Sequence, residues 1–198
     1  ELELRSVPQG QVIKTMTSSG TTGQQVSKIY LDKITSANQT KALVHIMSDM
    51  LGGKRFPMLI LDTRSVIKDR KKFSARGAGI LGFSMFGRDT TYALDDNMEL
   101  DMAAVREFLE RHKEETILMF GFTYIIWEHF YKVLKKQNIY LDCSNGILLH
   151  GGGFKKLAEE AVDNATYKAK LNEVCGIQRV CNYYGMVEQT GSIFMECE

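Results

Sequence analysis

The chain has 198 residues, of which 44% are hydrophobic, so it has enough apolar surface to bury a core of its own. Its 25 basic and 24 acidic residues are interspersed and give a net charge of +1, which excludes an electrostatic surface for nucleic acid or anionic lipid. The longest apolar run, residues 117–127, is far shorter than the roughly 20 residues that cross a bilayer. We therefore expect a globular protein without a membrane span.

Strand-like and helix-like patterns alternate along the first half of the chain. Alternating apolar residues predict a strand over 26–31, and a single apolar face predicts a helix over 35–51, ended by two glycines. Continuous apolar runs predict buried strands over 56–62 and 79–86. Residues 64–77 carry six basic side chains and are predicted to be a solvated loop or short helix, with a phosphate site as the less favoured alternative.

The second half continues the same alternation. Acidic residues and an asparagine at 95–97 are a capping signal, and apolar residues spaced by three or four positions from Met98 to Leu109 predict an amphipathic helix. The remaining predicted elements are a strand at 116–120, a helix at 124–136, a strand at 146–149, a helix at 154–174 and a strand at 179–183.

Apolar strands separated by helices imply an α/β fold in three layers, with a mostly parallel β-sheet flanked by helices on both faces. No repeat or linker divides residues 1–198, so we expect a single α/β domain. The chain begins at Glu1 without a methionine and ends at Glu198 within a strand-like pattern, which favours a fragment of a longer protein.

The cysteines favour a reducing environment. Cys143, Cys175, Cys181 and Cys197 lack the paired spacing of a metal site. Together with ten methionines they favour a cytoplasmic location without disulfides. We interpret all four as small buried apolar residues.

The first motif is "TSSGTTG" at residues 17–23. Its glycines let backbone N–H groups converge on an anion, and its hydroxyls can turn towards phosphate oxygens. The motif therefore predicts a polyphosphate cradle, with an ordinary Ser/Thr/Gly turn between strands as the alternative. No Gly-Lys-Ser/Thr follows Gly23, which excludes the usual nucleotide-triphosphatase loop.

The second motif, "LLHGGG" at residues 148–153, ends a predicted buried strand with three glycines. A flat ring can approach the bare backbone at such a place. Two interpretations remain open for His150, which is either a strand-end histidine bonded to a backbone carbonyl or a residue of the site.

The third motif, "NYYGMVEQTG" at residues 182–191, also follows a predicted strand. It offers an aromatic face at Tyr184, a bare backbone at Gly185 and a carboxylate at Glu188. Mg²⁺ prefers oxygen ligands that it shares with substrate phosphates, so Glu188 is a candidate metal ligand.

In this order the three motifs resemble those of the adenylate-forming superfamily, whose members join a carboxylate to AMP. The stretches "SSGTTGQ", "LLHGGGFKKL" and "YYGMVEQTGSIF" are most similar to LuxE acyl-protein synthetases, with phenylacetate-CoA ligases as near relatives. The resemblance implies that the chain is part of a large N-terminal domain that uses ATP and Mg²⁺. It also implies activation of a fatty or related carboxylic acid as an acyl-adenylate, followed by transfer to a protein cysteine thiol.

The resemblance assigns roles to individual positions. The implied phosphate-binding residues are Thr17, Ser18, Ser19, Gly20, Thr21, Thr22 and Gly23. The residues implied to lie around the adenine are His150, Gly151, Gly152, Gly153, Asn182, Tyr183, Tyr184 and Gly185, with Tyr184 stacked on the ring. Thr22 and Glu188 are the implied catalytic residues, and Glu188 is also the implied Mg²⁺ ligand. The implied acyl-pocket residues are Phe120, Gly121, Phe122 and Thr123, with ordinary core packing as the equal alternative for the two phenylalanines.

The chain also departs from the superfamily pattern. Gln25-Val26 stands where many members carry Pro-Lys, so Lys28 is not assigned to phosphate, and Val187 stands where many carry threonine. The ribose-binding aspartate, the C-terminal lysine and the acceptor cysteine of the family pattern would lie beyond Glu198. We therefore expect the chain by itself to fold but not to catalyse adenylation.

Two alternative functions remain open. An acyl-CoA ligase like the phenylacetate-CoA ligases would transfer the acyl group to CoA, whereas a non-catalytic nucleotide-binding relative would only bind. The expected partners are the carboxylic acid and an acyl-accepting protein thiol or CoA, with an acyl-reductase or acyl-transferase as a further candidate.

Overall fold

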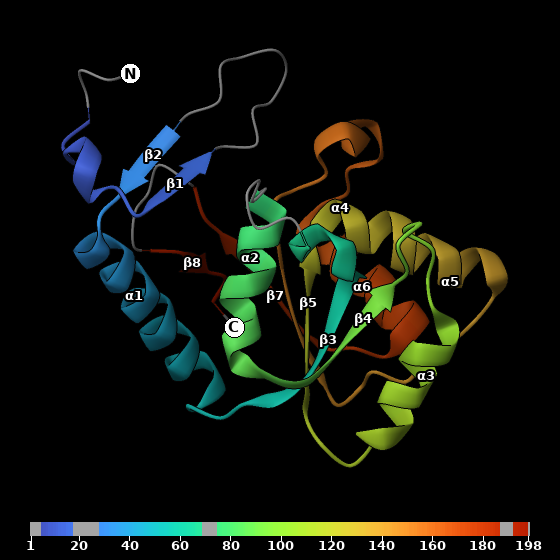
Figure 1. Cartoon of the computed structure of the whole chain (residues 1–198). Helices are drawn as coiled ribbons and strands as arrows, with labels where there is room; N and C mark the ends of the chain where they lie inside the picture. The colour runs from blue at the N-terminus through green and yellow to red at the C-terminus, as the bar shows by residue number, and fades with distance from the viewer. Residues whose placement is uncertain (1–4, 18–27, 69–74, 187–191, 198) are drawn as a thin grey trace.

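A computed structural model describes residues 5–17, 28–68, 75–186 and 192–197 (Figure 1). Its strands are β1 (Lys14–Thr17), β2 (Lys28–Leu31), β3 (Phe56–Thr63), β4 (Gly87–Leu94), β5 (Ile117–Phe122), β6 (Gly146–Gly151), β7 (Arg179–Tyr184) and β8 (Phe194–Met195). Its α-helices are α1 (Lys33–Leu51), α2 (Ala75–Phe83), α3 (Met102–Arg111), α4 (Thr123–Ile125), α5 (Lys132–Gln137) and α6 (Asn164–Cys175). The shorter helical segments are η2 (Gln9–Gln11), η3 (Arg64–Ile67), η4 (Ser84–Phe86), η5 (Ile126–Tyr131) and η6 (Lys155–Glu160).

The predicted mostly parallel sheet is confirmed. Six strands lie in the order β4-β3-β5-β6-β7-β8, and every neighbouring pair is parallel except β7 and β8. Because β4 lies on one side of β3 and β5 on the other, the strand order reverses at β3. Ligands of open α/β sheets bind at such a reversal, beyond the carboxyl ends of the strands.

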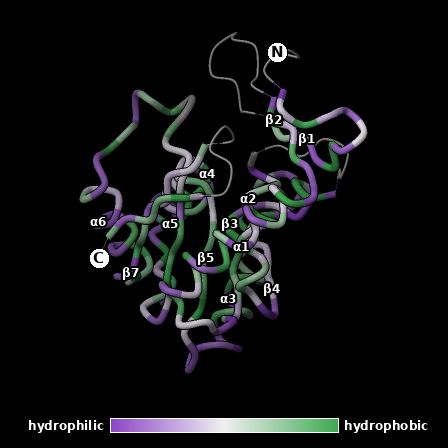
Figure 2. Tube along the Cα trace, turned by 90° about the vertical axis from the view of Figure 1, so that its left-hand side faces the viewer, coloured by the Kyte–Doolittle hydropathy of each residue, from purple (hydrophilic) through white to green (hydrophobic). Residues whose placement is uncertain are grey.

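Strands β1 and β2 form a separate antiparallel pair, in which Thr17 lies opposite Lys28. Figures 1 and 2 both show this pair towards the end of the molecule where the carboxyl ends of the parallel strands lie. The predicted strand at 26–31 is therefore present as β2, although residues 26 and 27 lie outside the described residues.

Helices cover both faces of the six-stranded sheet, which confirms the three layers. On one face α1 and α2 bury Met47 and Phe83 against β3 and β5, and on the other α3 and α6 bury Phe108 and Leu171. Figure 1 shows the strands between α1 and α2 on one side and α3 and α6 on the other, and the tube coloured by hydropathy shows that the central strands are mostly hydrophobic (Figure 2). Each of these buried side chains stabilises the fold by about 2 kcal/mol through loss of apolar surface from water.

Helix ends follow local capping chemistry. The Asp32 carboxylate accepts a hydrogen bond from Thr35 N at 2.7 Å at the start of α1, and Gly52 ends the helix with φ +66°. The predicted helix at 154–174 is interrupted, because Asp163 caps a new helix, α6, by accepting from Thr166 N at 2.7 Å. This predicted helix is therefore the segment η6 followed by α6.

Residues 95–97 do not cap helix α3, which corrects the prediction from the sequence. Asp95 accepts hydrogen bonds from Asn97 N and Glu99 N and so forms a turn, in which Met98 has a φ of +66°. The cap of α3 is Asp101 instead, which accepts from Ala104 N at 2.9 Å. Met98 therefore precedes the helix.

The predicted strand at 79–86 is wrong, because these residues form the end of α2 and the segment η4. Ile80 and Phe83, three positions apart, are both buried, whereas Leu81 is 41% exposed, which is the pattern of one helix face. Short apolar runs do not distinguish a buried strand from a helix. Gly79 also lets the helix approach the sheet, since a β-carbon there would lie 3.0 Å from Phe122 Cζ.

Strand β4 was not predicted. Its sequence, GRDTTYAL, begins with polar residues and has no continuous apolar run or strict alternation. It lies at the edge of the sheet, where only one neighbour covers it, and its first residues are largely exposed. Edge strands carry a weaker hydrophobic signal than central ones for this reason.

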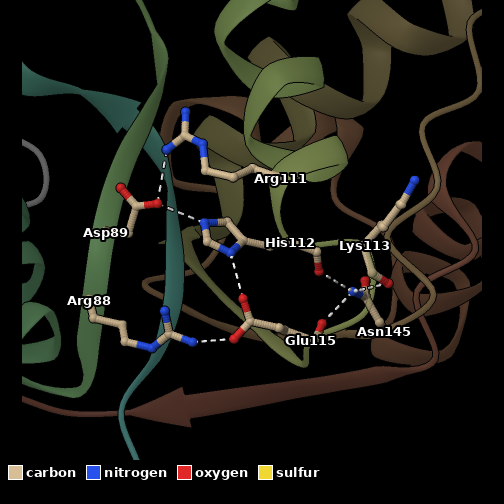
Figure 3. Close-up of polar contacts among 7 residues, drawn as sticks. All are labelled: Arg88, Asp89, Arg111, His112, Lys113, Glu115 and Asn145. Atoms are coloured by element: carbon tan, nitrogen blue, oxygen red, sulfur yellow. Dashed lines mark hydrogen bonds and ion pairs between the residues drawn. The ribbon is translucent and has the colours of Figure 1, made fainter.

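The amino end of the sheet carries a cluster of polar side chains around the buried His112 (Figure 3). His112 Nε2 lies 2.7 Å from Asp89 Oδ2, and Nδ1 lies 2.9 Å from Glu115 Oε1. Hydrogen bonds from Arg111 and then His112 lower the pKa of Asp89, and those from His112 and then Arg88 lower the pKa of Glu115. Asn145 Nδ2 donates to the His112 carbonyl oxygen at 3.2 Å and so joins β6 to this cluster.

All four cysteines are free thiols, as predicted, but their burial is not uniform. Cys143, Cys175 and Cys181 are buried as expected. Cys197 is exposed, which corrects the prediction for that residue, because it follows the edge strand β8. Among the described helices, none is long and apolar enough to cross a membrane.

Candidate functional site

Three segments singled out in the sequence lie side by side at the carboxyl ends of neighbouring strands. Phe122 of β5 is opposite Gly151 of β6, and Gly151 is opposite Tyr183 of β7. The FGFT segment (residues 120–123), the glycine motif (LLHGGG, 148–153) and the described part of the tyrosine motif (NYYGMVEQTG, 182–191) therefore meet at one edge of the sheet, although about 30 residues separate each from the next in sequence. Parallel pairing produces this arrangement because all carboxyl ends lie at the same edge.

The backbone of the glycine motif turns sharply after β6. A β-carbon on Gly151 would lie 2.6 Å from the Tyr183 carbonyl oxygen, and one on Gly152 would lie 2.9 Å from Phe122 Cδ1. Gly152 and Gly153 also have φ values of +85° and +61°, which side chains rarely adopt. Both are exposed, so the turn presents bare backbone at the edge of the sheet.

His150 lies beneath this turn and is only 2% exposed. Its Nδ1 is 2.9 Å from Thr123 Oγ1, and Thr123 Oγ1 donates to the Gly151 carbonyl oxygen at 3.0 Å. Burial is the main cause that lowers the pKa of His150 to about 4; the charge of Glu196 opposes the shift and that of Lys168 adds to it. His150 is therefore neutral at pH 7.

Phe120 and Phe122 are part of an aromatic layer on the opposite face of these strands. Phe120 is fully buried, and its ring centroid lies 4.5 Å from that of Phe83 and 6.0 Å from that of Phe122. The Tyr183 ring packs 5.0 Å from Phe83, and burial raises the pKa of Tyr183. Gly121 faces the other side of the sheet, where a β-carbon would lie 3.0 Å from Leu61 Cβ. Phe120 therefore packs in the core in this structure, and Phe122 is 6% exposed below the glycine turn.

A shallow hollow of about 340 Å³ lies beside the tyrosine motif. Tyr184 is 58% exposed and lies opposite Phe194 of β8, which is 55% exposed, so two aromatic side chains border the hollow. The other lining residues are Asn164, Asn182, Tyr183, Met195 and Glu196. Aromatic faces beside amide and carboxylate groups form a surface that suits a flat polar ring.

Glu196 was not predicted from the sequence. It accepts hydrogen bonds from Lys168 Nζ at 2.7 Å and from Asn182 N at 3.0 Å, and from the Asn164 side-chain amide. Burial acts to raise the pKa of Glu196, but these hydrogen bonds outweigh it and the pKa is lowered. No motif marks Glu196, because its position depends on the pairing of β8 with β7.

Asp62 and Arg76 form a second unpredicted feature, at the carboxyl end of β3 where the strand order reverses. Asp62 is fully buried, and its carboxylate oxygens lie 2.8 Å from Arg76 Nε and 2.8 Å from Arg76 Nη2. Burial raises the pKa of Asp62, and the Arg76 charge opposes the shift. Arg76 belongs to the basic stretch considered for phosphate, as does Lys68, which pairs with Asp96. In the described part of that stretch these two cations therefore already face carboxylates.

Most of the residues predicted to bind phosphate lie outside the described part of the chain. Thr17 ends β1, whereas Ser18, Ser19, Gly20, Thr21, Thr22 and Gly23 lie outside the described residues. Glu188 also lies outside them, and Gly185 is exposed just after β7. Within the described ranges, no group of three His, Cys, Asp or Glu side chains is placed to hold a metal ion. The described part of the site is therefore its glycine, tyrosine and FGFT portions.

Solved structures share this fold. The chain is similar to 2-hydroxyisobutyryl-CoA ligase in an open conformation with 2-HIB-AMP and CoA, with a TM-score of 0.56 and 12% identity over 93% of this chain and 38% of that chain. It is similar to coronafacic acid ligase from Pectobacterium brasiliense, with a TM-score of 0.52 and 15% identity over 85% of this chain and 29% of that chain. The chain therefore spans well under half of the length of either ligase.

The comparison with curated proteins finds no match. The family model described as "Acyl-protein synthetase, LuxE" matches residues 2–198, almost the whole chain. The three motifs in the sequence agree with this match, and so does the meeting of the described parts of the second and third motifs at one edge of a parallel sheet. The chain belongs to the LuxE family of acyl-protein synthetases.

Proposed function

We propose that the protein containing this chain activates a carboxylic acid with ATP as an acyl-adenylate and passes the acyl group to a protein cysteine thiol. The observation that supports this most directly is the alignment of Phe122, Gly151 and Tyr183 at one edge of the sheet, in a chain of the LuxE family. A fatty acid is the proposed substrate, and the cytoplasm is the proposed location.

The residues beside the tyrosine motif fit an adenine ring. Tyr184 offers an exposed aromatic face, and the neighbouring Asn182 is exposed in the same hollow. Gly152 and Gly153 offer bare backbone, and a β-carbon on Gly153 would meet nothing within 4 Å. A flat ring with hydrogen-bonding edges can therefore approach from solvent without displacing core side chains. We propose that these residues hold the adenine.

The hydroxyls and backbone amides of residues 17–23 are proposed to hold the phosphates, with Thr22 and Glu188 in the catalytic roles. In the proposed reaction a carboxylate oxygen of the acid attacks the α-phosphorus of ATP and pyrophosphate leaves. Mg²⁺ bound at Glu188 would neutralise phosphate charge. Such a displacement needs positioned donors more than a general base, and hydroxyls and amides supply them.

The acid is proposed to bind near the FGFT segment, residues 120–123, between β5 and the helix that begins at Thr123. Phe122 and Gly151 are adjacent there, so the acyl and nucleotide positions share a border. That proximity is what joining a carboxylate to a nucleotide requires.

The test is ATP–pyrophosphate exchange by the complete protein with a panel of short, medium and long-chain acids. We expect exchange that depends on the acid, and labelled fatty acid that becomes bound to the protein through a hydroxylamine-sensitive thioester. Release of the acyl group only to added CoA would instead identify a CoA ligase. Absence of exchange with every acid, while ATP still binds, would identify a non-catalytic nucleotide-binding protein.

The Mg²⁺ role has its own test. Glu188→Gln removes the charge and keeps the volume, so we expect exchange to fall by about a hundredfold or more without a change in thermal unfolding. Glu159→Gln, at an exposed position in η6, is the matched control and is expected to keep the exchange rate. An unchanged rate in Glu188→Gln would exclude it as a metal ligand.

A further inference from the structure

The hydrogen bonds around Thr123 determine which nitrogen of His150 carries a proton. The Gly151 carbonyl oxygen can only accept, so the single hydroxyl proton of Thr123 points towards it at 3.0 Å. The Thr123 oxygen must then accept from His150, whose Nδ1 lies 2.9 Å away. The proton of the neutral imidazole is therefore on Nδ1, and Nε2 holds a lone pair.

The imidazole is buried among packed side chains. It is 2% exposed, and its ring centroid lies 4.6 Å from that of Tyr167, whose hydroxyl is 3.5 Å from the Thr123 carbonyl oxygen. Among the described atoms, His150 Nε2 has no hydrogen-bond partner. Two charged groups act on the ring, Lys168 of α6 and Glu196 just after β8, and they pair with each other at 2.7 Å. Among the described residues, the His150 side chain therefore forms one hydrogen bond, to Thr123.

This chain of bonds joins the two segments that border the proposed site. Thr123 ends the FGFT segment and begins the helix, whereas Gly151 begins the glycine turn. We propose that His150 is a positioning residue that acts through Thr123 on the Gly151 carbonyl, and so holds the glycine turn in the orientation that binds the nucleotide. This inference rests on the proposed function, because it assigns His150 a part in ATP binding.

Matched substitutions separate the hydrogen bond from simple packing. His150→Asn keeps a side-chain N–H at the place of Nδ1, whereas His150→Leu fills similar space without a donor. Thr123→Ser keeps the hydroxyl, and Thr123→Val keeps the shape without it. His112→Leu is the control: His112 is also buried and has two side-chain partners (Figure 3), but it precedes β5 at the amino end of the sheet.

The experiment measures pyrophosphate exchange by the complete protein against ATP concentration, together with thermal unfolding of each variant. We expect His150→Leu and Thr123→Val to raise the KM for ATP about tenfold with kcat changed less than about threefold. His150→Asn and Thr123→Ser should keep a KM near that of the unmodified protein. His112→Leu should lower the unfolding temperature without changing the KM.

The inference is overturned if His150→Leu keeps the normal KM, if His150→Asn is as impaired as His150→Leu, or if His112→Leu raises the KM equally. A second measurement does not depend on activity: ¹H–¹⁵N spectra of the histidine rings should show His150 protonated on Nδ1 alone at pH 7. A proton on Nε2 would overturn the bond pattern itself. If the unmodified protein shows no exchange with any acid, the proposed function fails, whereas the ring spectrum still decides the bond pattern.

Discussion

Gly151 of β6 lies directly opposite Tyr183 of β7, and a β-carbon on Gly151 would lie 2.6 Å from the Tyr183 carbonyl oxygen and 2.8 Å from its ring. Atoms at these distances would overlap, and the Tyr183 carbonyl oxygen could move away only if the backbone of β7 moved with it. The close approach of these two strands therefore requires glycine at the start of the turn that borders the proposed site.

We expect Gly151→Ala to lower the free energy of unfolding by about 2 to 3 kcal/mol, because the β-carbon forces β6 and β7 apart. Gly153→Ala has open space and only a left-handed backbone, so it should cost about 1 kcal/mol. Urea titration of both variants measures the difference. Equal costs would show that the two strands separate more easily than their geometry indicates.

Removing the Arg76 side chain should leave the Asp62 carboxylate buried without its positive partner. Asp62 is fully buried against Arg76, so Arg76→Met is expected to cost about 3 kcal/mol of stability. The double variant Arg76→Met with Asp62→Leu should recover most of that loss, because no charge is left buried. A double-mutant cycle in urea measures the coupling. If the losses of the two single variants simply add in the double variant, the ion pair has no energetic role.

The buried His150 should make the protein sensitive to mild acid. Its pKa is about 4 in the folded chain and 6.5 in the unfolded chain, so between these values the unfolded state binds more protons and stability falls as the pH falls. Between pH 7 and pH 4.5 this amounts to about 2 kcal/mol. Stability curves of the unmodified protein and His150→Asn should therefore converge on acidification. A constant gap between the two curves would contradict a buried neutral imidazole.

Tyr184 should contribute to ATP binding and little to stability. Tyr184→Ala removes an aromatic face that is 58% exposed, so we expect ATP affinity to fall about tenfold with an unfolding free energy changed by less than about 0.5 kcal/mol. Tyr140 has the same exposed fraction but precedes β6 at the amino end of the sheet, so Tyr140→Ala is the control. Calorimetric titration with ATP and Mg²⁺ measures the ATP affinity of each variant of the complete protein. Equal losses of ATP affinity in the two variants would contradict the proposal that Tyr184 contacts the adenine.

Much of the fold could be predicted from local patterns. The central strands β3, β5 and β6 are buried on both faces, and their apolar runs at 56–62, 116–120 and 146–149 predict them within three residues at either end. The alternation of these apolar strands with helices predicts the mostly parallel sheet and the helices on both of its faces. The edge strand β4 lacks such a run and does not show in the sequence, and the short apolar run at 79–86 predicts a strand where the chain forms the end of α2 and η4.

The motifs of the candidate site could also be predicted from the sequence. Runs of glycine that expose backbone groups, and an aromatic residue followed by glycine, are visible in the sequence without knowledge of the fold. The sequence by itself determined that these segments exist, that each follows a strand and that they resemble one family. Only the tertiary structure decided their contacts. The bond from His150 to Thr123 spans 27 residues, that from Asp62 to Arg76 spans 14, and that from Asn182 N to Glu196 spans 14. Such pairs depend on strand register and helix packing, which local propensity does not specify.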